Sequence, residues 1–387
     1  MRIVHVFRAP VGGLFRHVMD LAREQERCGH QVGIFCDATF AGDRNEALLR
    51  ALEADLSLGV ERSPMRRNPH WSDAAALARM GSFATRVGAQ VLHGHGSKGG
   101  LYARLGGVGR SSGPVRAYTP HGGSLNYKPG SLIHKAYMAI EHLLENGTDL
   151  FLFESRFIAE RFRDYVCETN ALTRIVLNGL HAHELEPAIA SKGAADFLYI
   201  GEFRFAKGID NLLQAMAQLR AVALRQPTLL LVGQGPDEPA LRELVAKLGM
   251  SQHVSFRTPM AARDAFTLAR AMIVPSRFES MPYVVIEAAG ARMPIISTDV
   301  GGIPEIFGDE RDRLIPADDV PALVNAMQAS MLASDAMLQA PALRLAEHID
   351  ENFSVVKMTA TVLDAYGEAM SLRHPLQTGQ TAWRKAG

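Results

Sequence analysis

The sequence predicts an α/β protein with two doubly wound domains, each built around a parallel sheet. Short apolar runs alternate with amphipathic helical stretches along nearly the whole chain. The runs are rich in Val, Ile, Leu and Phe at successive positions, as expected of strands that helices cover on both faces. The alternation restarts near the middle of the chain. This restart indicates two domains with a cleft between the carboxyl ends of their strands.

The predicted elements form two series. The first series of strands is Arg2–Phe7, Gln31–Cys36, Val91–His93, Val115–Thr119, Leu150–Phe153 and Arg174–Leu177. The second is Phe197–Ile200, Thr228–Val232, His253–Phe256, Ala271–Pro275 and Pro294–Ser297. Helical patterns lie at Leu14–Gly29, Ala74–Gly88, Ile209–Leu224 and Glu238–Gly249, and several end at glycine. Turn residues with weak periodicity follow Asn178, so we expect domains at 1–185 and 186–370 and a frayed tail at 371–387.

Composition excludes several classes of protein. The 387 residues are 47% hydrophobic and 21% charged, which is typical of a globular chain with room for two cores. The 41 basic residues equal the 41 acidic residues, so net charge gives no attraction to nucleic acid. Three cysteines without CxxC spacing argue against a disulfide framework or a zinc site and favour the reducing cytoplasm. No apolar run approaches the ~18 residues of a membrane span, so any membrane contact is expected to be peripheral.

The most informative segment is PSRFESMPYVVIEAAGARMPIISTDVGGIPEIF, from Pro275 to Phe307. A strand ends in a loop, and we expect a helix to begin at Pro282, because proline suits the first helical position. The free N–H groups and positive end of that helix form an anion site suited to a diphosphate. Glu279 lies just before the helix, and Glu287 lies roughly 7–8 Å further along it. Two carboxylates so placed can accept hydrogen bonds from hydroxyl groups at both ends of a ligand.

This segment resembles the Glu-x7-Glu signature of family-4 retaining glycosyltransferases, which have the GT-B fold of two Rossmann-like domains facing each other across a cleft. The resemblance implies that Glu279 contacts the transferred sugar and that Glu287 holds the ribose of the donor. It also implies an acceptor-binding domain at 1–185 and a nucleotide-sugar-binding domain at 186–370. The backbone expected to bind phosphate and sugar is that of Ser280, Met281, Pro282 and Tyr283.

A second element, FLYIGEFRFAKGIDNLLQAM, carries a lysine at the expected start of a helix. A cation is disfavoured there unless an anion is present, so Lys207 is a candidate phosphate ligand. The stretch is similar to the strand–loop–Lys-Gly element of the same family. That family often has arginine directly after the first glycine, where this chain has Glu202. Arg204, two residues further on, is the candidate to supply the missing charge.

Two glycine-containing turns also match the family. Gly233 follows a strand in LLLVGQGPDE and is expected either to contact the nucleotide or to form a structural turn. Gly12 and Gly13 directly follow the first strand. They permit a tight turn or the close approach of a ligand, and the resemblance places them between donor and acceptor.

Three histidines follow strand ends and should face the cleft: His93 and His95 in VLHGHGSKGG, and His121 in YTPHGGSLNY. In the family, a histidine at the place of His121 contacts the donor sugar near the reacting carbon, which makes His121 the preferred mechanistic residue of the first domain. His93 and His95 have the i, i+2 spacing of metal ligands on a strand, but no motif supplies a third ligand. The sequence also has no DxD pair, so we expect no metal site and metal-independent transfer.

The resemblance implies front-face transfer with retention of anomeric configuration and no cofactor. The expected catalytic residues are His121, Lys207 and Glu279, with Lys207, Arg204 and the helix start stabilising the departing diphosphate. The expected donor is a UDP- or GDP-linked hexose. By family analogy, the acceptor is a glycan or a lipid-linked oligosaccharide of surface polysaccharide biosynthesis.

Several alternatives stay open at the level of sequence. A nucleotide-sugar epimerase shares the two-domain shape, and a noncatalytic sugar-nucleotide binding module would share the fold. A nicotinamide oxidoreductase is disfavoured, because the first strand is not followed by a dinucleotide fingerprint. The basic stretch 61–71 and the stretch 126–144 are either an ordinary loop and core helix or a surface that rests on the cytoplasmic face of a membrane.

Overall fold

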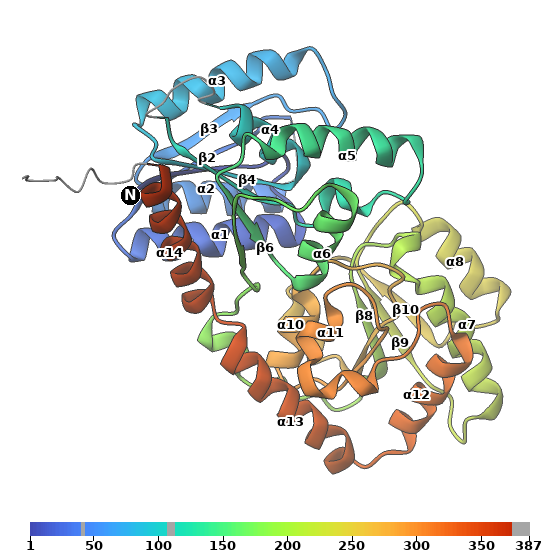
Figure 1. Ribbon diagram of the computed structural model, residues 1–387. Helices are drawn as coiled ribbons and strands as arrows, with labels where there is room; N and C mark the ends of the chain where they lie inside the picture. The colour runs from blue at the N-terminus through green and yellow to red at the C-terminus, as the bar shows by residue number, and fades with distance from the viewer. Residues whose placement is uncertain (40–42, 107–112, 374–387) are drawn as a thin grey trace, which may run out of the picture.

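The computed structural model describes residues 1–39, 43–106 and 113–373, and it shows two parallel sheets flanked by helices (Figure 1). Within the described residues, the first sheet has seven strands in the order β3-β2-β1-β4-β5-β6-β7. The second has five strands in the order β10-β9-β8-β11-β12. The predicted class, two doubly wound Rossmann-like units, is therefore confirmed.

Every strand pair in the described sheets is parallel. The strands of the first sheet are β1 (Arg2–Val6), β2 (Gln31–Asp37), β3 (Gly59–Ser63), β4 (Val91–His95), β5 (Val115–Thr119), β6 (Leu150–Phe153) and β7 (Leu172–Ile175). Those of the second are β8 (Ala195–Ile200), β9 (Leu229–Val232), β10 (Val254–Arg257), β11 (Ala269–Val274) and β12 (Ile295–Ser297). Strand β3 was not predicted, because GVERS at the sheet edge lacks an apolar run. Strand β7 begins and ends two residues earlier than expected.

Helices connect successive strands. In the first half of the chain they are α1 (Gly12–Arg27), α2 (Asp43–Asp55), α3 (Ser72–Arg86), α4 (Gly96–Leu105), α5 (Leu132–Glu145) and α6 (Arg156–Tyr165). In the second half they are α7 (Ile209–Val222), α8 (Glu238–Lys247), α9 (Ala262–Phe266), α10 (Tyr283–Gly290), α11 (Ile303–Phe307), α12 (Val320–Leu332), α13 (Asp335–Asn352) and α14 (Val355–Arg373). Short 3-10 turns are η1 (Gly123–Asn126), η2 (Ala182–Leu185), η3 (Phe205–Lys207) and η4 (Gly308–Arg313). A search of the described helices found none with the length and apolar character needed to cross a membrane.

The unbroken apolar runs of the strands are explained by helices on both sheet faces. Along β8, Phe197 packs into one buried cluster and the adjacent Leu198 packs into another on the opposite face. Ala271 and Met272 of β11 divide in the same way. Because both faces of each strand are buried, alternation of polar and apolar residues is absent from these runs.

The last helix, α14, crosses back to the first sheet. Its apolar side chains, including Val362 and Tyr366, pack in one cluster with Val91 of β4 and Leu150 of β6 (Figure 1). This packing differs from the prediction that placed residues up to 370 in the second domain, because periodicity reveals an apolar helix face but not which sheet it covers. Residues 371–373 continue α14 instead of starting the predicted tail, and the rest of that tail, 374–387, lies outside the described residues.

Candidate active site

The predicted donor-binding loop, residues 280–283, lies where the two domains meet. Asn178, which follows β7, donates a hydrogen bond from its Nδ2 to the carbonyl oxygen of Met281 at 3.0 Å. A Cβ added to Gly122 would lie 2.1 Å from the hydroxyl oxygen of Ser280, so the loop after β5 touches the donor-binding loop. Two segments that are distant in sequence therefore contact residues 280–283.

Two predicted site residues form a direct ion pair. The Nζ of Lys207, at the end of η3, donates to Oε1 of Glu279 at 2.6 Å. The hydroxyl of Ser276 donates to the same oxygen at 2.7 Å. Glu279 is only 8% exposed, so its carboxylate has exchanged water for these two donors. The motifs that carry Lys207 and Glu279 lie 72 residues apart, and the parallel sheet brings them together.

The helix after the donor-binding loop begins one residue later than predicted. Pro282 is the N-cap of α10, with φ −74° and ψ 118°, because its ψ is extended and not helical. Among the described residues, the N–H groups of Ser280, Met281 and Tyr283 donate to no protein acceptor. The carbonyl of Ser280 accepts from the N–H of Gly302 at 2.7 Å, which fixes the loop. These free N–H groups leave an anion site at the start of α10.

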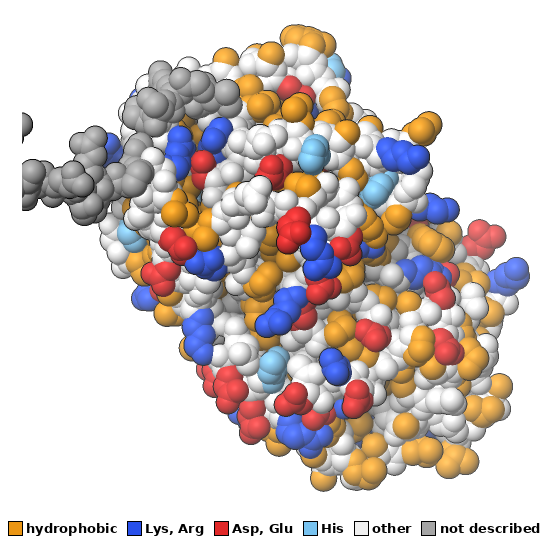
Figure 2. Space-filling model, viewed as in Figure 1, with side chains coloured by type: hydrophobic (Ala, Val, Ile, Leu, Met, Phe, Trp, Pro, Cys, Tyr) orange, Lys and Arg blue, Asp and Glu red, His pale blue; other side chains and the backbone are white. Residues whose placement is uncertain are grey.

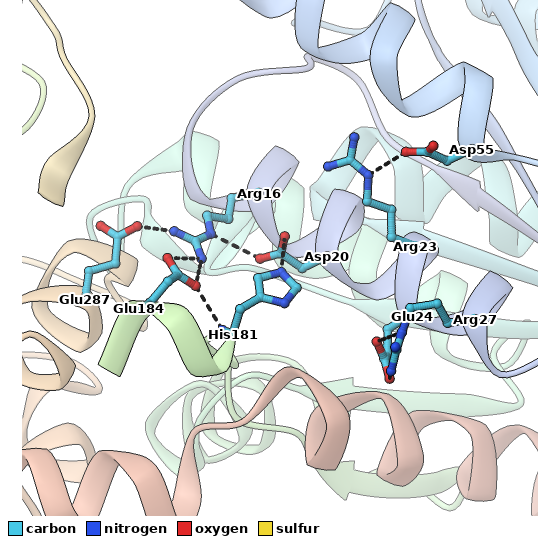
Figure 3. A network of polar contacts seen from close by, with 9 residues as sticks. All are labelled: Arg16, Asp20, Arg23, Glu24, Arg27, Asp55, His181, Glu184 and Glu287. Carbon is cyan, nitrogen blue, oxygen red and sulfur yellow. Dashed lines mark hydrogen bonds and ion pairs between the residues drawn. The ribbon is translucent and has the colours of Figure 1, made fainter. Parts of the chain in front are cut away.

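Glu287 is engaged by a residue that the sequence analysis missed, Arg16 of α1. Figure 3 shows the Arg16 guanidinium between three carboxylates. It pairs with Asp20 at 3.1 Å, with Glu184 of η2 at 2.6 Å, and with Glu287 of α10. Burial raises the pKa of Glu287, an effect that Arg16 opposes and the charges of Glu184 and Asp20 reinforce. One guanidinium thus links the first domain, the connecting segment and α10, and its place four residues after Gly12 was the available sequence signal.

Arg204 lies apart from the Lys207–Glu279 pair. Its Nε contacts Oε1 of Glu202 at 2.6 Å, and the two side chains are 47% and 50% exposed. The carboxylate that occupies the family's arginine position therefore neutralises the predicted substitute. An exposed pair of this kind contributes little to stability.

The glycines of the predicted turns have clear structural reasons. Gly233 has φ 155°, and a Cβ there would lie 1.9 Å from the carbonyl oxygen of Gly201, so the ends of β8 and β9 meet only if this residue lacks a side chain. Gly12 has φ 67°. A Cβ on Gly13 would lie 3.4 Å from the Tyr283 ring, which places this turn against the donor-binding loop.

The predicted His121 ends a chain of hydrogen-bonded histidines. It has φ 50° and its Nε2 lies 3.1 Å from Nδ1 of His95. Nε2 of His95 lies 2.9 Å from Nδ1 of His5, whose Nε2 lies 2.8 Å from Oε1 of Gln25. Burial lowers the pKa of His95 and His121 well below the usual range and lowers that of His5 to about 4, so these rings are neutral.

The remaining histidines surround this chain. His17 packs edge-on against His121, with ring centroids 4.9 Å apart, and burial lowers its pKa to about 4. The predicted His93 is bonded at both nitrogens, to Thr119 Oγ1 at 2.8 Å and to the Tyr366 hydroxyl at 2.7 Å. Sequence reasoning missed His5 and His17. The position of His5 depends on the pairing of β1 with β4, and that of His17 depends on the packing of α1.

Two family models match this chain and identify the family to which it belongs. A model described as "Glycosyl transferase 4-like domain" matches residues 12–179, and one described as "Glycosyl transferases group 1" matches residues 194–332. The chain belongs to the group 1 glycosyltransferases. The predicted family is thereby confirmed.

Individual relatives match part of this chain at modest identity. A D-inositol 3-phosphate glycosyltransferase from Saccharomonospora viridis is 31% identical over 185 residues, which are 45% of this chain and 42% of the relative. The putative teichuronic acid biosynthesis glycosyltransferase TuaC of Bacillus subtilis is 34% identical over 131 residues, which are 34% of this chain and 31% of the relative. The chain thus spans less than half of the length of these curated relatives.

Solved structures match over nearly the whole chain. Anabaena HepE in complex with UDP-glucose has a TM-score of 0.78 at 18% identity, covering 95% of this chain and 100% of that one. A sucrose-phosphate synthase from Thermosynechococcus elongatus has a TM-score of 0.78 at 19% identity, covering 96% and 100%. These matches confirm the GT-B fold for this glycosyltransferase.

Proposed function

We propose that this glycosyltransferase moves a hexose-type sugar, with retention of configuration, from a UDP- or GDP-sugar to a glycan or lipid-linked acceptor in surface polysaccharide biosynthesis. The observation that carries the proposal is the Lys207–Glu279 ion pair beside the free N–H groups that begin α10. A cation and free backbone N–H groups can bind a diphosphate, and a buried carboxylate can accept hydrogen bonds from sugar hydroxyls. The solved HepE complexes with UDP and with UDP-glucose support a UDP-sugar donor. The named glycosyltransferase relatives support sugar transfer as the reaction.

Donor binding replaces contacts between side chains of the protein. Lys207 is neutralised by Glu279, and Glu287 is neutralised by Arg16. We assign the diphosphate to Lys207 and to the amides of 280–283, the sugar hydroxyls to Glu279, and the ribose hydroxyls to Glu287. Each carboxylate accepts hydrogen bonds from protein side chains before binding and from sugar or ribose hydroxyls after it. The free energy of desolvating the carboxylates therefore does not weaken donor binding.

The proposed chemical step depends on electrostatics. As the bond from sugar to diphosphate breaks, negative charge grows on the leaving group, and Lys207 with the α10 amides stabilises it. A phosphate oxygen accepts the proton of the acceptor hydroxyl on the same face. His121 adjoins the donor-binding loop through its neighbour Gly122. We assign His121 to the transferred sugar near the reacting carbon. We propose that this route needs no metal ion and that closure of the domains excludes water.

The donor assignment is tested by a thermal-shift panel of UDP-, GDP- and ADP-sugars. A ligand that binds only the folded protein at 100 times its Kd stabilises it by about 2.7 kcal/mol, so the correct donor should raise the melting temperature clearly above the others. Free UDP or GDP released only when an acceptor is supplied would separate a transferase from an epimerase or a binding module. A panel in which every nucleotide sugar leaves the melting temperature unchanged would contradict the proposed donor site.

We further propose that α5 rests on an anionic membrane surface, which fits a lipid-linked acceptor at the cytoplasmic face. One face of α5 packs on the core, but Leu132 is 86% exposed and Leu143 is 73% exposed, with Ile133 and Ile140 between them. Lys135 is exposed on the same helix. Figure 2 shows hydrophobic and basic side chains together over the surface where α5 lies. Exposed apolar residues accompanied by a lysine suit the interface of an anionic bilayer.

The double variant Leu132→Ser/Leu143→Ser should bind vesicles containing phosphatidylglycerol at least tenfold more weakly than the unaltered protein. Each leucine withdrawn from the bilayer forfeits about 1.5–3 kcal/mol of burial. Co-sedimentation with vesicles measures the effect, and Leu224→Ser, at a 97% exposed position beyond α7, is the matched control. Equal vesicle binding by the double variant and the control would rule out α5 as the contact surface.

A further inference from the structure

Three histidines, His17, His95 and His121, lie close together where the two domains meet. Their hydrogen bonds determine which ring nitrogens are free to coordinate a metal ion. The first, His17, has a fixed tautomer. The carbonyl of Met281 can only accept, so Asn178 donates to it through Nδ2 and turns its Oδ1 toward Nδ1 of His17 at 3.0 Å. His17 must therefore carry its proton on Nδ1. With the proton of the neutral ring on Nδ1, its Nε2 bears a lone pair.

The second histidine, His95, is fixed in the same manner through a longer chain. Oε1 of Gln25 can only accept, so His5 donates to it through Nε2 and presents a lone pair at Nδ1. His95 then donates from Nε2 to that lone pair at 2.9 Å, which leaves Nδ1 of His95 unprotonated. This nitrogen lies 3.1 Å from Nε2 of His121, with a single proton between the two.

We infer that His17, His95 and His121 bind a transition-metal ion of the zinc class. One ring nitrogen from each of the three lies within 4.8 Å of the other two. Neutral imidazoles are common ligands of zinc, nickel and copper. Tetrahedral zinc with Zn–N distances of about 2.0–2.1 Å needs nitrogens about 3.3 Å apart, close to the 3.1 Å between His95 and His121. Rotation of the His17 and His121 rings brings the other nitrogen–nitrogen distances, which are at most 4.8 Å, to this value.

The hydrogen bonds behind the ligands are those expected of a metal site. Metal-binding histidines donate their second N–H to a fixed acceptor, which sets the tautomer and the ring orientation. Asn178 is that acceptor for His17, and His5 is that acceptor for His95. In the complex, the metal replaces the proton between His95 and His121, and His121 carries its proton on Nδ1 instead. No net proton release accompanies binding to the neutral rings.

A neighbouring trio is a poorer candidate, although its nitrogens are equally close. His5, His93 and His95 also have ligand atoms within 4.8 Å of one another. Both nitrogens of His93 are already bonded, to Thr119 and Tyr366, and both nitrogens of His5 are bonded as well. A metal there would break several buried hydrogen bonds, whereas His121, which is partly exposed, opens the first trio toward solvent.

The consequence for activity rests on the proposed function. Three protein ligands leave a fourth zinc position open, and His121 is the residue assigned to the transferred sugar. A bound metal therefore withdraws His121 from the sugar, so zinc should raise KM for the donor. Binding of the metal itself does not depend on which donor, if any, the protein uses.

The experiment titrates chelator-treated protein with ZnCl₂ by isothermal calorimetry and with CoCl₂ by visible absorption, without donor present. We expect one equivalent to bind, with affinity reduced at least tenfold in His17→Ala and in His121→Ala. Asn178→Ala should lower affinity about 10–100-fold, although it removes no ligand. Bound cobalt should show the d–d bands of low coordination and no thiolate charge-transfer band.

Two controls keep the site assignment falsifiable. His142→Ala removes an exposed histidine of α5 and should leave binding unchanged. His93→Gln disrupts only the competing trio and should also retain binding, provided that its melting curve shows a folded protein. Unchanged zinc affinity in His17→Ala and His121→Ala would overturn the proposal. A cobalt spectrum of hydrated or thiolate-bound ion would overturn it even if the histidine variants failed to fold.

Discussion

Lys207→Ala is expected to lower kcat for sugar transfer by about 10²–10³, because one preorganised donor to a developing negative charge is worth roughly that much. The side chain of Lys207 pairs with Glu279. In the proposed mechanism it contacts the diphosphate of the bound donor. Charge on the leaving group grows as the bond breaks, so the loss should fall mainly on kcat and only weakly on KM. Steady-state release of nucleoside diphosphate with acceptor present measures both constants.

Arg204→Ala is the matched control for that experiment. Arg204 lies in the same loop and carries the same charge, but it already pairs with Glu202 in an exposed position. Its removal should change kcat less than about threefold, since exposed pairs of this kind contribute about 0–1 kcal/mol. If Arg204→Ala were as damaging as Lys207→Ala, the role of the family's missing arginine would belong to Arg204. If neither variant altered turnover, the proposed diphosphate site would be wrong.

The sequence was sufficient to predict features that depend on local pattern. Continuous apolar runs predicted buried parallel strands, and the motifs around Lys207 and Glu279 were identified separately before the structure showed that they touch. Both motifs follow strands of one parallel sheet, so their meeting at its carboxyl edge follows from topology. Strand β3 escaped prediction, because GVERS at the sheet edge lacks an apolar run.

Contacts between segments that are distant in sequence could not be predicted. The position of Arg16 shortly after Gly12 places it near the predicted cleft, but it does not indicate that Arg16 meets Glu184 and Glu287. The histidine chain likewise depends on β1 pairing with β4, which sets His5 beside His93. The destination of α14 is a third case, since its apolar face would fit either sheet. In each case the missing information is the relative placement of whole elements and not the chemistry of a residue.

Glu287→Ala is expected to raise KM for the donor by about 10–100-fold with kcat nearly unchanged. A hydrogen bond to a charged group contributes about 1.5–3 kcal/mol. We expect the proposed ribose contacts of Glu287 to be the same in the ground and transition states. Loss of such uniform binding appears in KM alone. Donor binding measured by thermal shift should weaken in parallel, because the ribose is remote from the reacting carbon.

The structure supplies a control that separates ribose binding from domain packing. Glu287 also pairs with Arg16, so its loss removes an interdomain contact as well as the proposed donor contact. Glu184→Gln weakens the ion pair between Arg16 and residue 184 and leaves the proposed ribose site unchanged. If Glu184→Gln raised KM as much as Glu287→Ala, the effect would arise from the Arg16 network and the ribose assignment would fail. A large rise in KM for Glu287→Ala alone places the carboxylate on the donor, since Arg16 retains Asp20 and Glu184 in that variant.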